Sequence, residues 1–580
     1  MIKYNNVITH KNRMTMKQLI ISLFALLSVA TSQAQLSEVY DFTVGGIYYS
    51  ITSTGDLTVS VCPGTKWIST SRTDYQGDIT IPDTVVNAGK TYRVTAIKSG
   101  TFQDCLQLTS LSIPANVVSF GSNFLYDTPA LAAITVDENN IACVCVGEAL
   151  CNKELTELIG YATGKGSDFV IPEGVKTIES GIFQSLAKTF TIQLPQSLTS
   201  IGQAAFNNCK KLQSVVIPNN VTDIGRHAFS DCAALESIKL GTSLKNIGDE
   251  AFLNCVKLSS MDFPASLRSV GKSAFYGCTG LSAISSPNLD SWLKISFTDM
   301  FSRAGTTLTL AGQPLTDLKL PEGLTKVPDY SFFYLTGLKS VTLPDGIKSI
   351  GTGAFAYCTA LDTINMPATL DTIGIMALYN TALKNIKIPA TLSLIDSSAF
   401  NQCHSLATAV LPSKLSEIKY GTFLSCALSS IDIPANVTAI RESAFDGCPM
   451  TSVVIPAKVT SIGKSAFWDG LKVVTCCATV PPLLVYDSFY HGSQIYPGSA
   501  PKDRTLYVPE GTRNAYLAST YWSKFFDADK IIELGSSNIT GINALQSQSE
   551  NIITYDLLGR RVQNPAKGIY IQNGKKVVLQ

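Results

Sequence analysis

Residues 212–232 read Leu212-Gln-Ser-Val-Val-Ile-Pro-Asn-Asn-Val-Thr-Asp-Ile-Gly-Arg-His-Ala-Phe-Ser-Asp-Cys232. This pattern recurs along the chain and therefore indicates the fold. Leu338-Lys-Ser-Val-Thr-Leu-Pro344 and Leu428-Ser-Ser-Ile-Asp-Ile-Pro434 repeat its first part. The prolines recur every 22 or 23 residues, with one longer step between Pro287 and Pro321. A fixed period of this length is typical of a repeat array.

Each repeat predicts one coil of a β-rich solenoid. The last two apolar residues before the proline alternate, as a strand with one buried face requires. Proline cannot donate to a strand ladder and therefore ends the strand. We expect Val-Thr-x-Ile-Gly to turn the chain back, and Ala-Phe-x-x-Cys to lead to the next strand. One coil cannot bury its own apolar face, so coils must stack. An ordinary all-β domain would not explain the same residue types at one spacing.

A row of cysteines accompanies the repeat, three residues after its Phe. Because the position faces the core, we expect these thiols to remain free and to act as small buried apolar groups. Leu186, Leu335 and Thr381 occupy the equivalent position in other repeats, which an obligatory disulfide partner would not allow. The predicted structural row comprises Cys105, Cys209, Cys232, Cys255, Cys278, Cys358, Cys403, Cys426 and Cys448.

The consensus Leu-x-x-Ile-x-Ile-Pro-x-x-Val-Thr-x-Ile-Gly-x-x-Ala-Phe-x-x-Cys resembles the leucine-rich repeat of the BspA type, found in bacterial surface proteins. The resemblance covers roughly residues 80 to 490. It implies an exported, non-enzymatic cell-surface protein with an adhesive role toward host matrix proteins or other cells. The asparagine position of commoner leucine-rich repeats here holds Asn220, Ser243, Thr369 or Lys414, so a stack of Phe and Cys is expected to replace an asparagine ladder.

The termini read as export and capping segments. Lys11, Arg13 and Lys17 precede an apolar run at 19–30 and a small-residue cleavage site, which is typical of a secretory signal and too short to span a bilayer. We expect no transmembrane segment in the mature chain. The predicted divisions are a signal peptide at 1–34, an N-terminal β cap at 35–97, the solenoid at 98–490, a capping coil with a short helix at 491–535, and a linker with a C-terminal β tail at 536–580.

The tail Tyr555-Asp-Leu-Leu-Gly-Arg-Arg-Val562 and Lys567-Gly-Ile-Tyr-Ile571 reads as short strands, and Asn573-Gly574 as a two-residue turn. This segment resembles the C-terminal sorting domain of type IX secretion in Bacteroidota. A small terminal β module without a sorting role is the alternative.

Composition excludes several functions. The chain of 580 residues has 45 basic and 44 acidic side chains, whereas a nucleic-acid binder would carry a basic patch. Four histidines without a Ser, Cys or Asp at catalytic spacing argue against a hydrolase, and Cys143-x-Cys145 and Cys476-Cys477 lack the spacing of zinc sites. We therefore expect no enzyme activity, no metal and no cofactor. The disulfide state of these four cysteines and of Cys151 stays open.

The strand face is the expected binding surface. The residue two before each proline should point outward, which gives a row of mixed charge suited to a host matrix or cell-surface protein. Glycan capture is an alternative, for which Trp292 and Trp468 are the candidate aromatic platforms; a structural surface protein without a specific ligand is another. The insertion around Trp292 is either a longer repeat with its own core or a binding protrusion. The candidate binding residues are Lys239, Asp262, Lys319, Asn365, Lys387, Asp432 and Trp292.

Overall fold

The structure is a computed structural model that describes most of the repeat region. It covers residues 40–64, 73–164, 168–186, 188–298, 306–467, 470–485, 488–489 and 504–534, and the backbone of strands at 554–555, 568–572 and 575–579. The predicted signal peptide lies outside the described residues, as does Trp468. The chain divides into two compact units, Met1–Gly166 and Ser167–Gln580. Along the described part of the chain, no helix combines the length and apolar character needed to cross a bilayer.

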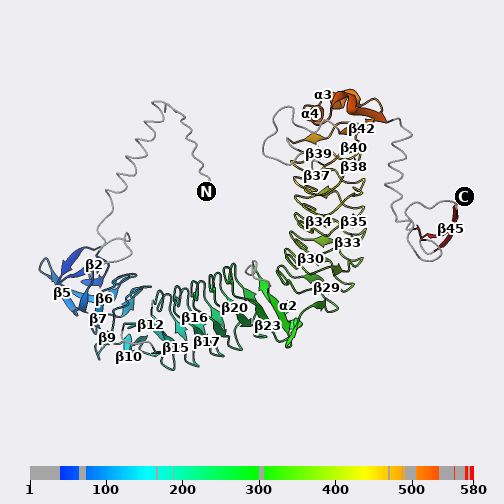
Figure 1. The fold of residues 1–580 in the computed structure, drawn as a ribbon. Coiled ribbons are helices and arrows are strands. Elements are labelled where there is room, and N and C mark those ends of the chain that lie inside the picture. Colours follow the sequence, from blue (N-terminus) through cyan, green and yellow to red (C-terminus); the bar gives the residue numbers. More distant parts are fainter. Residues whose placement is uncertain are drawn as a thin grey trace, which may run out of the picture. The chain divides into compact units, whose positions relative to one another are not determined.

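The first unit begins with a mixed sheet and continues into the first coils (Figure 1). In the mixed sheet, β6 pairs parallel with both β3 and β8. A second sheet, of three parallel strands, forms the first coils. The insertion after Asp137 forms an antiparallel meander of β10, β11 and β12. The strands are β1 (Phe42–Val44), β2 (Ile47–Ser53), β3 (Thr58–Val61), β5 (Thr84–Asn87), β6 (Lys90–Ile97) and β8 (Ser119–Phe120), then β4 (Gly77–Thr80), β7 (Leu108–Ile113) and β9 (Ala133–Val136), then β10 (Cys143–Val146), β11 (Ala149–Asn152) and β12 (Glu157–Tyr161).

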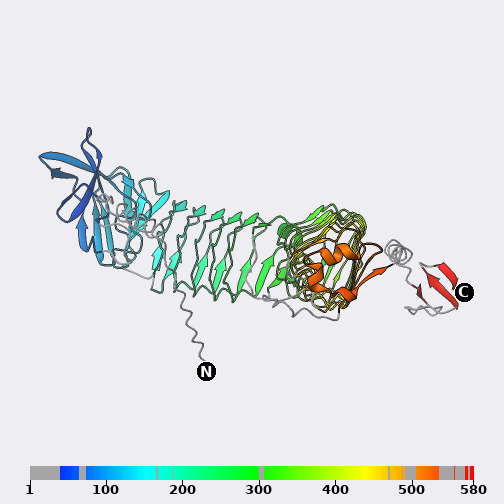
Figure 2. The same ribbon diagram turned by 90° about the horizontal axis from the view of Figure 1, so that it is seen from above.

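The second unit is a solenoid in which most repeats add one short strand before the proline position, although residues 428–433 of one repeat form none. Equivalent residues of neighbouring repeats pair in parallel, as Ser214 with Ser237 and Asp317 with Ser340. Seen from above, successive coils between 168 and 298 lie side by side in a regular row (Figure 2). These strands are β13 (Asp168–Val170), β15 (Thr191–Gln193), β17 (Ser214–Val216), β19 (Ser237–Lys239), β21 (Ser260–Asp262), β23 (Ala283–Ser286), β25 (Thr307–Leu310), β27 (Asp317–Lys319), β29 (Ser340–Thr342), β31 (Thr363–Ile364), β33 (Asn385–Lys387), β35 (Thr408–Val410), β38 (Ser452–Ile455), β40 (Val473–Cys476) and β42 (Thr505–Pro509). A short strand, β26 (Gln313–Pro314), pairs antiparallel with β25.

A second row of strands lies where the sequence predicted only a turn. The x-Ile part of most repeats pairs in parallel with its neighbour over two residues, so most coils contribute to two sheets. Two residues are too few to show an alternating pattern, which is why the sequence did not reveal them. The strands are β14 (Thr177–Ile178), β16 (Ser200–Ile201), β18 (Asp223–Ile224), β20 (Asn246–Ile247), β22 (Ser269–Val270), β24 (Ser296–Phe297), β28 (Lys326–Val327), β30 (Ser349–Ile350), β32 (Thr372–Ile373), β34 (Leu394–Ile395), β36 (Glu417–Ile418), β37 (Ala439–Ile440), β39 (Ser461–Ile462) and β41 (Leu483–Leu484).

The core contains stacks of Phe rings flanked by the cysteines, and Leu378 occupies the Phe position between Phe355 and Phe400. Rings of neighbouring coils, such as Phe206 and Phe229, lie with centroids 5.1–5.7 Å apart and planes within 0–12° of parallel. The expected stack of Phe and Cys side chains is thus present. The rings are fully buried, so each coil closes the apolar face of the one before it.

The longer step after Pro287 contains a short helix, α2 (Leu289–Leu293), with Asn288 capping its first turn. The C-terminal coil after β42 carries two short helices, a 3₁₀ turn and a strand, β43, that pairs with β42. Trp522, from this coil, donates its indole N–H to the Pro482 carbonyl at 2.8 Å. Its elements are α3 (Arg513–Ala518), α4 (Trp522–Phe525), η1 (Ala528–Lys530) and β43 (Ile531–Leu534).

The C-terminal tail contains a small antiparallel sheet. Strand β45 (Gly568–Gln572) pairs with both β44 (Thr554–Tyr555) and β46 (Lys575–Leu579). The register pairs Gln572 with Lys575, as a two-residue connection requires.

Candidate functional site

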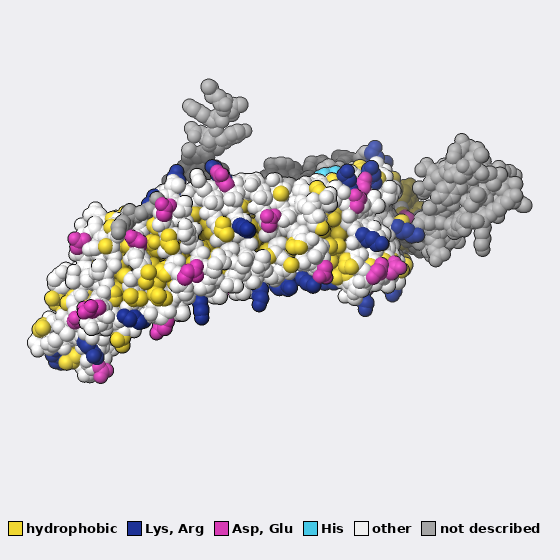
Figure 3. All heavy atoms as spheres, turned by 90° about the horizontal axis from the view of Figure 1, so that it is seen from below, with side chains coloured by type: hydrophobic (Ala, Val, Ile, Leu, Met, Phe, Trp, Pro, Cys, Tyr) yellow, Lys and Arg dark blue, Asp and Glu magenta, His cyan; other side chains and the backbone are white. Residues whose placement is uncertain are grey.

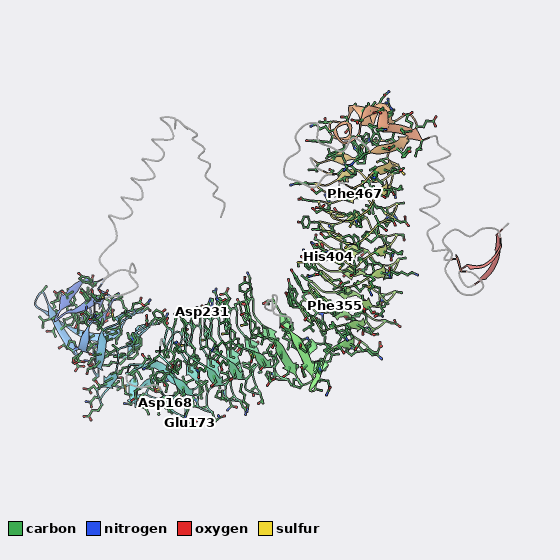
Figure 4. The ribbon with its side chains drawn as sticks, viewed as in Figure 1. Asp168, Glu173, Asp231, Phe355, His404 and Phe467 are labelled. Atoms are coloured by element: carbon green, nitrogen blue, oxygen red, sulfur yellow. The ribbon has the colours of Figure 1, made fainter. Side chains whose placement is uncertain are left out.

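The strand face is the most regular exposed surface of the second unit. In six of its strands the middle residue is buried and the residues on either side are exposed, as in Ser237-Ile238-Lys239 and Ser260-Met261-Asp262. The strand alternation therefore places two side chains per coil in solvent. Asp168 of β13 and Asp231 of a connecting segment lie on opposite sides of the stacked coils (Figure 4). The view from below shows charges of both signs scattered among polar and apolar side chains (Figure 3).

Hydrogen bonds between coils fix many side chains on this face. The Asp317 carboxylate accepts from Ser340 at 2.5 Å, and Asp168 accepts from Thr191 at 2.7 Å. Donation by Ser340 and Thr316 holds the pKa of the Asp317 carboxyl below its ordinary value. The face is consequently a pre-ordered polar surface, which reduces the entropy that a partner must remove on binding.

The predicted row lies where the repeat places it. Five residues of the row are exposed two positions before the proline slot of their repeats. They are Lys239, Asp262, Lys319, Lys387 and Asp432. Asp262 also accepts a hydrogen bond of 2.5 Å from Ser285 of the next coil.

Asn365 differs from the rest of the predicted row. Its amide accepts from the Leu343 N–H at 2.6 Å and donates to the Leu343 carbonyl at 2.8 Å. The side chain thereby replaces a strand pairing, since β31 ends one residue earlier. Asn365 has a structural role, whatever else it contacts.

Trp292 is a core residue rather than part of a binding surface. Its side chain is 1% exposed, and its indole N–H donates to the Ser331 carbonyl at 2.7 Å. Phe263 and Phe297 pack against its ring at 5.9 and 5.2 Å. The insertion is therefore a longer repeat with its own small core, and Trp292 offers no ring face to a glycan.

All fifteen cysteines are free. In the repeats of the second unit, each thiol of the row donates to a carbonyl of the preceding coil, as Cys255 does to Phe229 at 3.1 Å. Burial raises the pKa of the Cys358 thiol to about 12. A buried, protonated thiol is a poor nucleophile, so this row is structural.

The structure describes two of the four histidines, His227 and His404, and they lie on different coils. His227 lies 2.7 Å from Glu250 on the neighbouring coil, and His404 Nδ1 lies 3.0 Å from the Ser425 carbonyl. His491 lies outside the described residues. Among the residues that the structure describes, no three His, Cys, Asp or Glu side chains are placed to hold a metal ion.

A shallow pocket of about 610 Å³ lies beside His404 and is lined by Ser425, Asp446 and Pro449 among others. Its origin is readable in the sequence, because one residue separates Cys426 from Leu428, whereas two follow Cys403 before Leu406. The coil that contains Cys426 is therefore shorter here than the coil that contains Cys403, and the pocket lies at this difference. Cys426 borders the pocket, but burial raises its pKa and its thiol donates to the Phe400 carbonyl, so it is not an activated nucleophile.

The sequence reasoning missed a group of four tyrosines, Tyr330, Tyr334, Tyr357 and Tyr379. The rings of Tyr334, Tyr357 and Tyr379 lie in contact on neighbouring coils, and Phe333 links Tyr330 to Tyr357. A comparison of equivalent positions would have singled out Tyr334 and Tyr357, because other coils carry Asn208, Asp231 or Asn254 there.

The family model described as BspA type leucine rich repeat region matches the chain in six copies, over residues 80–145, 161–292, 309–428 and 395–481. No curated protein matches the chain. A leucine rich cell surface protein from Faecalibacterium prausnitzii is a similar solved structure, with 25% identity, 67% of this chain and 93% of that chain covered, and a TM-score of 0.39. A leucine-rich repeat protein from Bacteroides ovatus is 23% identical, with 75% and 100% covered and a TM-score of 0.39.

The matched segments span more than half of the chain and coincide with the coils described above. The chain belongs to the BspA-type leucine-rich repeat family.

Proposed function

We propose that this chain is an exported, non-enzymatic cell-surface protein that binds other proteins through the strand face of its solenoid. The observation that carries the proposal is the regular array of two exposed side chains per coil over consecutive coils. Membership of the family supports a surface role. A repeat surface of this kind suits broad contact with an extended protein, such as a host matrix component.

The test is a binding assay of the mature protein against purified matrix proteins. Charge reversal at Lys239, Lys319 and Lys387 together should weaken binding at least tenfold and leave the melting temperature nearly unchanged, because all three side chains are exposed. Reversal at Lys464, which is exposed on a connecting segment, is the matched control. Retention of full affinity in the triple variant would exclude the strand face as the binding surface.

Export by the type IX route is part of the proposal. It rests on the likeness of the tail to a sorting domain and on the antiparallel sheet at 554–579. Removal of residues 536–580 should keep the protein from reaching the surface of the cell that produces it. Surface display of a protein without the tail would indicate another export route.

A further inference from the structure

The segments that connect the second strand of each coil to its Cys form a ridge, named here the return ridge. On this ridge, residues 330–334, 352–357, 375–380, 397–402 and 420–425 contain no charged side chain, and Asp329 lies directly before the first of them. The equivalent segments 226–231 and 249–254 carry Arg226, Asp231, Asp249 and Glu250, whereas 180–185 and 203–208 are also uncharged. The tyrosines therefore lie in a part of the ridge that carries few charges.

The tyrosines stand at positions where the fold favours other residues. Tyr330, Tyr334 and Tyr357 have φ values of 55°, 63° and 61°. This left-handed backbone is unfavourable for a large side chain and suits Asn, Asp or Gly. Asn208, Asp231 and Asn254 occupy the position of Tyr334 and Tyr357 in other coils. The solenoid does not need tyrosine there, and strained positions of this kind concentrate at functional sites.

The absence of a side chain at Gly353 leaves room for the ring of Tyr330. Gly353 lies beside Tyr330, and an added Cβ would come within 2.7 Å of the Tyr330 ring. Other coils hold Ser273 or Met376 at the position of Gly353. A residue with a Cβ at position 353 would thus collide with the Tyr330 ring as it lies here.

The rings form one partly exposed cluster. Tyr334 and Tyr357 lie with centroids 5.0 Å apart, and Tyr357 and Tyr379 lie 4.9 Å apart. Phe333 meets Tyr330 and Tyr357 edge-on. Burial and the hydrogen bond to Tyr357 raise the pKa of Tyr379, so its phenol stays protonated. Ile375, 44% exposed, extends the apolar surface beside them.

Protein interface cores are rich in Tyr and Met and poor in charged residues, which matches this cluster. Aromatic-lined grooves bind proline-rich segments in the polyproline II conformation, whose carbonyls have no internal hydrogen bonds and can accept from phenol hydroxyls. That helix returns to the same face every three residues, or about 9 Å. Two steps of 5.0 and 4.9 Å between ring centroids place Tyr379 at most about 10 Å from Tyr334, which is of the same order.

We propose that the tyrosine cluster on the return ridge binds proline-rich protein segments in the polyproline II conformation. This site is separate from the strand face and does not depend on the function proposed for that face.

The test titrates the mature protein into labelled proline decamer and into a triple-helical (Pro-Pro-Gly)₁₀ peptide, followed by fluorescence anisotropy. The double variant Tyr334→Asn/Tyr357→Asn carries the residue that other coils use at this position, so it should fold normally. We expect it to bind at least tenfold more weakly. Tyr276→Asn, which removes an exposed tyrosine elsewhere on the ridge, and the triple strand-face variant should bind as the parent protein does.

Absence of binding to both peptides, or full binding by the folded double variant, would overturn the proposal. So would equal binding to a Gly-Ser peptide of the same length, because the site would then not select polyproline II. Binding of neutral oligosaccharides through the same tyrosines, without binding of the proline peptides, would assign the cluster to glycans instead. If the double variant unfolds, Tyr357→Phe removes one hydroxyl with the ring retained and should weaken binding severalfold; unchanged affinity would count against the site.

Discussion

Asn140 shows how one residue can replace several backbone pairings. It is 1% exposed in the insertion of the first unit. Its amide nitrogen donates to the carbonyls of Pro114 and Val117, each at 2.8 Å, and its oxygen accepts from the N–H groups of Ala142 and Cys143 at 2.9 and 3.0 Å. All four hydrogen-bonding positions of the amide are used. This role cannot be inferred from the sequence, because the neighbouring Asn139 is the same type of residue.

Asn140→Ala should destabilise the protein strongly. The substitution leaves two carbonyls and two N–H groups without their partner in the core, and each such group costs about 1 kcal/mol or more. We expect a loss of about 3–5 kcal/mol in the free energy of unfolding, measured by urea denaturation. Asn139→Ala is the matched control, since the exposed Asn139 bonds only to Asp137. Similar losses in both variants would contradict the role assigned to Asn140.

The repeat cysteines should be unreactive in the folded protein and reactive once it unfolds. Their thiols are buried and donate to carbonyls, which disfavours the thiolate that alkylating reagents attack. Mass spectrometry should find Cys209, Cys232 and Cys255 unmodified after native treatment at pH 8, and alkylated after unfolding without a reductant. Disulfide-linked peptides from neighbouring coils, such as Cys209 with Cys232, would contradict this expectation.

At the scale of the coil, the sequence predicts what its period repeats. The alternation before each proline located the strands, and the shared position of Phe and Cys located the core. Features that occur once were not predicted. The aromatic residue of an insertion can face either way, which is why Trp292 was misassigned to the surface. The return-ridge tyrosines depart from the consensus, and a search for the consensus passes over them.

A glycine follows many of the second strands, as Gly225 follows β18, whereas Asp396, Lys419 and Arg441 hold this position in other coils. A Cβ on Gly225 would lie 2.7 Å from the Gly202 carbonyl carbon of the preceding coil. Because that neighbour is backbone, it cannot move without separating the coils.

Gly225→Ala should therefore destabilise the solenoid by about 2–4 kcal/mol in thermal or urea unfolding. Gly346→Ala is the matched control, because an added Cβ there meets no atom closer than 3.8 Å. We expect that variant to be neutral or slightly stabilised through reduced entropy of the unfolded chain. The assignment fails if Gly225→Ala unfolds at the same urea concentration as the parent.

For the whole molecule, the sequence predicts a stack of coils and the regular outward face, since both follow from the period alone. The partner does not follow from it, because a ligand is selected by the few positions at which coils differ. One property does belong to the array as a whole. Buried thiols recur along the array, and burial raises the pKa of Cys358, Cys448 and Cys476 to about 12 from an ordinary value near 9.

These thiols predict a loss of stability at alkaline pH. Above pH 9 the unfolded chain releases the thiol protons, whereas the folded chain retains them until about pH 12, so the folded state binds more protons and the free energy of unfolding falls as pH rises. Each group contributes about 1.4 kcal/mol per pH unit. Urea unfolding between pH 8 and 11 should show this decline. Cys358→Thr places at this position the residue that Thr381 provides in another coil. Because threonine does not titrate in this range, the free energy of unfolding of the variant should fall less steeply with pH, by about 1.4 kcal/mol per pH unit. Identical slopes for the variant and the parent protein would mean that Cys358 keeps an ordinary pKa in the fold.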